Sequence, residues 1–189
     1  MNDRTFENLF EVTLTPLQKE LRNAINNNDF NLLSTETKEL LTDITYNLVV
    51  KNRYTKEYKI PPYIIVLKSL TTEEIIKFNY IISNLNSKEE TQFKKVFLIY
   101  PAMYIESISI MPEFLEKSNE IIPPPVLKPD ISFEEKIEIF EKFFLGISSE
   151  IYQQITTIIN EFVDLLNATR VFYGKIANFY TQTQNIYQG

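Results

Sequence analysis

The carboxy-terminal third of the chain carries a heptad pattern, which constrains the fold more than any other feature. From Ile151 to Ile186 the pattern advances by alternating steps of four and three, with Thr169 and Thr183 at two of its places. A parallel line of bulky residues widens the stripe: Tyr152, Ile159, Leu166, Tyr173, Tyr180 and Tyr187. An average spacing of about 3.5 residues keeps one face of a helix against a partner along its whole length. The pattern therefore predicts a long, bundle-forming helix over residues 149–188.

A helix of this length raises the question of what covers its far end. It would be about 60 Å long, whereas a compact domain of this size has a radius near ~16 Å. The helix could break near Gly174 and fold back, dock on the helix that contains Phe140, or pack on other chains. For residues 151–166 we expect an ordinary hydrophobic core. For residues 172–187 we expect projection toward another chain.

The predicted protein interface is the last part of this helix. Tyrosine dominates one line there, and the remaining positions are rich in Gln, Asn and Thr, a mixture that suits protein interfaces. A membrane-surface helix is disfavoured, because Lys175 is the only cation after Arg170. The predicted interface residues are Phe172, Tyr173, Ile176, Phe179, Tyr180, Ile186 and Tyr187.

Capping signals predict most of the other helices. Thr15 with Pro16 and Gln18 is typical of a helix start, and apolar residues follow at helical spacing. The same Ser/Thr-x-x-Glu signal recurs at Thr71, Ser87 and Ser132, and further helices are expected after Ser34 and from Ser148 or Ser149. The helix that follows Ser87 should stop at or before Pro101. For the helix after Ser132 we expect an apolar stripe of Ile137, Phe140, Phe144 and Leu145, closed by Gly146.

Extended segments are predicted in three places. The β-branched run Ile64-Ile65-Val66 and the alternating residues 104–110 favour short strands. Residues 111–129 contain five prolines, which favour an extended linker. The predicted fold is mainly α with minor β. Its expected parts are a helical domain over 1–110 with one or two short strands, a Pro-rich linker over 111–131, and a helical hairpin or coiled-coil-like region over 132–189.

Composition excludes several classes of function. The chain has no histidine and no cysteine, which removes the usual triads and thiolate sites, and its three glycines cannot form a phosphate-binding loop. The formal charge of −6 argues against a nucleic-acid surface. Acidic pairs at Glu73, Glu89 and Glu134 fall in predicted first helical turns, where they complement the dipole. We therefore expect no catalytic residue, cofactor, metal or small-molecule substrate.

Targeting signals are also missing from the sequence. The first residues, MNDRTFENLFEVTLTP, include acidic side chains and no apolar run of signal-peptide length. No apolar stretch approaches the roughly 20 residues that cross a bilayer. We expect a protein that is not secreted by a signal peptide and has no membrane partner.

Two segments resemble known proteins. VLKSLTTEEIIKFNYIISNL and FEEKIEIFEKFFLGISSEIYQQITTIINEF resemble the baseplate-hub and tail-assembly structural proteins of contractile-tailed bacteriophages, which carry capped acidic helices of this kind. The resemblance implies a non-enzymatic role in building a virion, a location in the virion or the host cytoplasm, and partners that are copies of this chain or other subunits of an assembly. It transfers no functional residue.

Three functional hypotheses follow. The first is a structural or assembly protein that associates through its aromatic carboxy-terminal helix. The alternative is a small adaptor or inhibitor that binds a partner through Pro123, Pro124 and Pro125. The third, a metal-dependent enzyme built on the paired carboxylates, has the least support because each pair is explained by its place in a helix.

Overall fold

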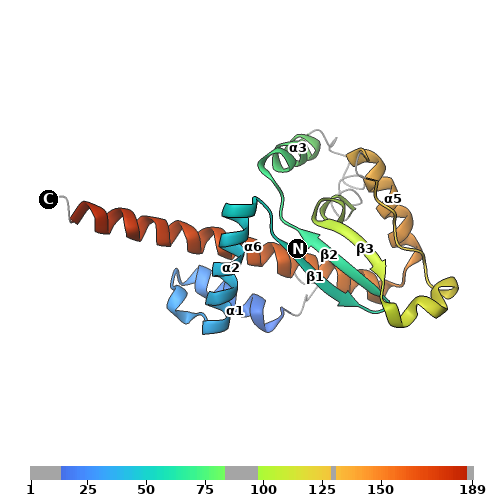
Figure 1. Cartoon of the computed structure of the whole chain (residues 1–189), viewed down its shortest axis with the longest axis horizontal. Coiled ribbons are helices and arrows are strands. Elements are labelled where there is room, and N and C mark those ends of the chain that lie inside the picture. The colour runs from blue at the N-terminus through green and yellow to red at the C-terminus, as the bar shows by residue number, and fades with distance from the viewer. Residues whose placement is uncertain (1–13, 84–97, 129–130, 187–189) are drawn as a thin grey trace, which may run out of the picture. The chain divides into compact units, whose positions relative to one another are not determined.

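A computed structural model describes residues 14–83, 98–128 and 131–186 of the 189-residue chain. The described chain is mostly helical, with a small three-stranded antiparallel sheet (Figure 1), so the predicted mainly-α class with minor β is confirmed. It divides into two compact units: residues up to Thr45 together with those from Val163 form unit 1, and Tyr46–Phe162 form unit 2. Each unit is described separately below.

Unit 1 contains α1 (Pro16–Asn26), the 3-10 helix η2 (Phe30–Leu32), the first part of α2 (Thr35–Lys51), and the part of α6 (Ser149–Ile186) that begins at Val163. The predicted start of α1 is confirmed, because Thr15 and Gln18 form a reciprocal capping box. Apolar residues on these helices are buried together in its core: Leu21, Ala24, Leu41, Ile44, Leu165 and Leu166.

Two polar clusters tie the helices of unit 1 together. Glu20 on α1 accepts hydrogen bonds from the backbone N–H of Ser34 and, at 2.8 Å, from the hydroxyl of Thr37, which fixes the start of α2. Asp164 on α6 accepts from the Gln18 amide at 2.9 Å and from the Arg22 guanidinium at 2.9 Å. Gln18 thus caps its own helix with one end of its amide and holds α6 with the other.

The sheet of unit 2 has one buried face. Its order is β1 (Thr55–Ile60), β2 (Tyr63–Lys68) and β3 (Ile105–Ile110), all antiparallel. Burial in β2 alternates strictly, because successive side chains of a strand point to opposite faces. The register places Tyr63, Ile65 and Leu67 of β2 on one face, and the β3 residues Ile105 and Ile108 lie opposite two of them. These five side chains are buried.

Helices cover this buried face. Phe162 near the middle of α6 stacks on Tyr54, with ring centroids 5.8 Å apart, and meets Tyr104 edge-on at 6.3 Å. Phe143 of α5 (Phe133–Gly146) meets the Tyr63 ring edge-on at 5.3 Å. The core of unit 2 therefore lies between the sheet and the helices α5 and α6.

The remaining elements of unit 2 border this core. They are α3 (Thr72–Ser83), a short helix over 98–104, and the 3-10 helix η3 (Pro112–Glu120). The predicted capping boxes at Thr71 and Ser132 are both present, at the starts of α3 and α5. The helix start predicted at Ser87 lies outside the described residues. Within the described part of the chain, no helix combines the length and apolarity that a bilayer span requires.

The prediction that a helix ends at or before Pro101 is wrong, because residues 98–104 are helical through the proline. The turn around Pro101 is buried, with Ile99 and Ala102 fully inaccessible. The burial of these side chains outweighs the tendency of a helix to end before a proline, because tertiary packing overrides local conformational preferences.

The prediction for the end of α5 also needs correction. Leu145 is 81% exposed, and Phe143 takes the expected buried place instead. Gly146 is the last helical residue and not the cap, which is Ile147. A side chain at Gly146 would lie 3.2 Å from Cγ2 of Ile122, so the glycine allows the Pro-rich segment to pass close to the helix.

The expectation of an ordinary core for the first heptads of α6 is confirmed. Ile155, Ile159, Phe162 and Leu165 are all buried. The Pro-rich segment has no regular structure over 122–128, and the Tyr63 hydroxyl donates to the Ile122 carbonyl at 2.8 Å. The division at residues 110 and 131 stays a prediction.

Candidate functional site

The predicted interface lies on the part of α6 that belongs to unit 1. Phe172 is half-buried, and its ring lies 5.5 Å from the ring of Phe30 in the same unit. Tyr173 is 47% exposed. The side chains of Ile176, Phe179, Tyr180 and Ile186, and all of Tyr187, lie outside the described residues. The described part of the predicted interface is therefore one residue that packs internally and one that faces solvent.

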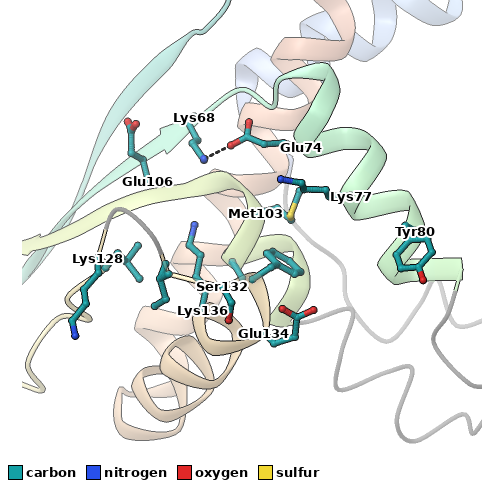
Figure 2. A pocket seen from close by; sticks show the side chains of 14 residues that line it. Lys68, Glu74, Lys77, Tyr80, Met103, Glu106, Lys128, Ser132, Glu134 and Lys136 are labelled. Carbon is teal, nitrogen blue, oxygen red and sulfur yellow. Dashed lines mark hydrogen bonds and ion pairs between the residues drawn. The ribbon is translucent and has the colours of Figure 1, made fainter.

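Unit 2 contains a pocket of about 820 Å³ that sequence reasoning did not predict (Figure 2). Its walls come from the ends of β2 and β3, from α3, from the 98–104 helix, and from the segment that leads into α5. Its lining includes charged side chains, among them Lys68, Glu74, Glu106 and Lys136. It also includes the apolar side chains of Ala102, Met103, Ile131 and Phe133. The pocket thus has a mixed lining of charged and apolar groups.

Glu74 is the centre of a hydrogen-bonded charge cluster. Lys68 on β2 donates to one of its oxygens at 2.5 Å, and Arg53 approaches both oxygens at 3.2 Å. The backbone N–H of Thr71 donates to the carboxylate at 2.8 Å as part of the capping box. Burial alone would raise the pKa of Glu74, but these hydrogen bonds and the two cations lower it from 4.5 to about 2. The carboxylate is therefore ionised at neutral pH.

A bulge in β3 places the second acid of the pocket. The register pairs Val66 with Ser107 but Leu67 with Ile105, so Glu106 has no partner on β2. Such an extra residue bends a strand and re-aims its side chain. The Glu106 carboxylate lies 3.7 Å from the Arg53 guanidinium, which joins it to the same cluster.

Lys136, in the first turns of α5, is the most perturbed cation of the pocket. Its amine donates to the Ile105 carbonyl at 2.9 Å and lies 5.7 Å from the centre of the Phe140 ring. Burial lowers the pKa of Lys136 to about 8, with help from the nearby Lys68 charge and against Glu74 and Glu106, which raise it. Figure 2 shows this amine pointing toward β3, while the Lys128 amine points away from it.

The chemistry open to this pocket is ion binding by lysine. Within the described residues, no group of three or more Asp or Glu side chains is placed to hold a metal ion. The acidic pairs at Glu73 and Glu134 lie in the first turns of α3 and α5, as predicted. The pair at Glu89 lies outside the described residues.

The sequence contains one signal that could have drawn attention to Lys136. The buried stripe of α5 includes Phe140 and Phe144, four residues apart, and one further step toward the start of the helix reaches Lys136. A lysine on the same face of the helix as buried phenylalanines is expected to be partly buried. Nothing in the sequence predicts the bulge at Glu106, because it depends on how β3 pairs with β2.

We expect the charge cluster to make stability depend on acid pH. Glu74→Gln should lower the free energy of unfolding by about 1–2 kcal/mol at pH 7, allowing for solvent screening. Because the folded-state pKa is depressed, this contribution is present above pH 4.5 and is lost as the pH falls toward about 2. Urea unfolding at pH 7, 4.5 and 2.5 measures it.

The neighbouring Glu73→Gln is the matched control for this measurement. Its side chain is 76% exposed, against 26% for Glu74, and it pairs with the exposed Lys77 one turn away. It should change stability by less than about 0.5 kcal/mol. Equal effects of the two substitutions at pH 7 would contradict the account of the cluster.

Comparison with known proteins found no matching protein family, no matching curated protein and no matching solved structure.

Proposed function

We propose that this protein is a non-enzymatic structural or assembly protein that associates through the aromatic last heptads of α6. Its partners are copies of itself or other subunits of a larger assembly. The proposed interface consists of Tyr173 and the residues that follow it on the same face: Ile176, Phe179, Tyr180, Ile186 and Tyr187. Phe172 stands at the edge of this interface, because its ring already contacts Phe30.

One observation carries this proposal: a single line of the helix changes from buried to exposed within seven residues. Leu166 is 3% exposed, whereas Tyr173, at the next place of the same line, is 47% exposed. The apolar sequence pattern nevertheless continues past Tyr173 to the end of α6. Large apolar side chains on a continued stripe favour a partner surface.

The setting that we propose is a bacteriophage virion, in its tail, baseplate or neck. The resemblance of residues 66–85 and 133–162 to phage tail-assembly proteins supports it. The absence of histidine and cysteine, which removes the commonest proton shuttle and the thiol nucleophile, fits a non-enzymatic role. The protein would then act in the virion or in the host cytoplasm during assembly.

Light scattering coupled to size-exclusion chromatography tests self-association. A monomer has a mass of 22.3 kDa, and we expect the full chain to elute as a larger species. The combined substitution Tyr173→Ser, Phe179→Ser and Tyr180→Ser should return it to the monomer mass, because it removes the central aromatic groups of the interface. Phe172 is left unchanged so that its contact with Phe30 is kept.

A matched control replaces exposed apolar residues elsewhere. Val49→Ser with Val50→Ser, both exposed on α2, should leave the oligomer intact. Circular dichroism should show equal helix content in all variants. A wild-type protein that stays monomeric at high concentration would refute self-association, and a triple variant with unchanged mass would refute this choice of surface.

A further inference from the structure

Lys136 has hydrogen-bonding capacity that the described protein does not use. An ammonium group has three N–H donors, and this one donates to the neutral carbonyl of Ile105. Among the described residues, no carboxylate lies within ion-pair distance of its nitrogen. A half-buried cation without an ion-pair partner is unfavourable. An anion that entered the pocket could accept hydrogen bonds from the Lys136 amine and act as its ion-pair partner.

Two of the glutamates in the described lining are already engaged with other cations. Glu74 is held by Lys68 and Arg53, and Glu106 lies near Arg53. Among the described residues that line the pocket there are four lysines and three glutamates, within a chain whose formal charge is −6. This described lining carries an excess of positive charge, which favours an anionic ligand.

The apolar residues of the lining indicate that the rest of the ligand is apolar. Ala102 and Met103 are buried side chains of the 98–104 helix, and Leu127, Ile131 and Phe133 add further apolar surface. The volume of about 820 Å³ lies in the usual range for small-molecule sites, roughly 300–1,000 Å³. An inorganic ion would leave these apolar side chains without a partner.

We propose that this pocket binds a small carboxylic acid with an apolar body, whose carboxylate accepts a hydrogen bond from the Lys136 amine while the body packs on Met103. The assembly role proposed above does not use this pocket, so the two proposals stand or fall separately. The proposal that the pocket binds a carboxylic acid differs from the prediction made from the sequence, which is that no small molecule binds.

Octanoate is a suitable probe, and the methionines report where it binds. The chain has three methionines, of which Met103 lines the pocket and Met111 lies at the end of β3 outside its lining. In the full chain labelled with ¹³C at the methionine methyl groups, octanoate should shift the Met103 signal and leave the Met111 signal in place. Met103→Leu identifies the signal. A shift of Met111 alone, or of neither, would overturn the proposal.

Two comparisons separate charge recognition from simple apolar binding. Octanamide, which has the same chain without the charge, should bind at least about tenfold more weakly than octanoate. Lys136→Met, which keeps the length of the side chain, should weaken octanoate by about tenfold or more, whereas Lys59→Met on the exposed side of β1 should not. Equal affinity for octanoate and octanamide would refute the role of the amine.

The pH dependence tests Lys136 without any substitution. The charged groups that face it are Lys68 of β2, Glu74 of α3, Glu106 of β3, and Arg53 just before β1. Because the pKa of Lys136 is about 8, its amine loses its charge between pH 7 and pH 9.5, while octanoate stays ionised. The octanoate affinity should fall by about tenfold over this range. A flat profile would contradict the proposal even if Lys136→Met failed to fold.

Discussion

Phe162→Ala should destabilise the protein by about 3–5 kcal/mol. Phe162 is fully buried, and its ring packs against Tyr54 on one side and Tyr104 on another. Alanine would leave a cavity between α6 and the sheet, and two aromatic contacts would be lost with the buried area. Urea unfolding followed by far-ultraviolet circular dichroism measures the change.

Tyr46→Ala is the control for this substitution. It removes a larger side chain, but Tyr46 is exposed on α2 and makes no described core contact. We expect a change within about 0.5 kcal/mol. Similar effects of the two substitutions would mean that Phe162 does not anchor α6 to the sheet.

Leu21→Ala should destabilise unit 1 by about 2–5 kcal/mol. Leu21 is fully buried on α1, one turn from the buried Ala24. Removing it opens a cavity in a core made of a few helices, which has few other apolar side chains to compensate. Native-state hydrogen exchange should show loss of protection across α1 together with the lower unfolding free energy.

Leu32→Ala tests whether burial explains that effect. Leu32 is the same residue type in the same unit, but it lies in η2 and is 48% exposed. Its replacement should cost less than about 1 kcal/mol. A cost equal to that of Leu21→Ala would show that leucine content alone, and not position, sets the stability of this unit.

Local signals explain why the helix starts were predictable. The capping boxes at Thr15, Thr71 and Ser132 are hydrogen bonds between residues three apart, so both partners can be recognised within a four-residue stretch of sequence. The strand over residues 63–68 was predictable for a similar reason, because its β-branched residues form a continuous run. These features depend little on the rest of the fold.

The candidate pocket depended on contacts that no local pattern records. Lys136 and its acceptor, the Ile105 carbonyl, are 31 positions apart in the sequence. The bulge at Glu106 follows from the pairing of two strands that are separated in sequence by α3, the undescribed stretch 84–97 and the short helix over 98–104. Pro101 shows the same limit, since its local effect on the helix was overridden by burial.

The contact between Gln18 and Asp164 sets an order of events during synthesis. These residues are 146 positions apart, so the ribosome must make all of unit 2 before Asp164 exists. At the usual rates of translation this takes on the order of ten seconds. During that time Gln18 of α1 lacks the Asp164 carboxylate that its amide contacts in the folded chain. Unit 1 therefore cannot close around α1 until its part of α6 has been made.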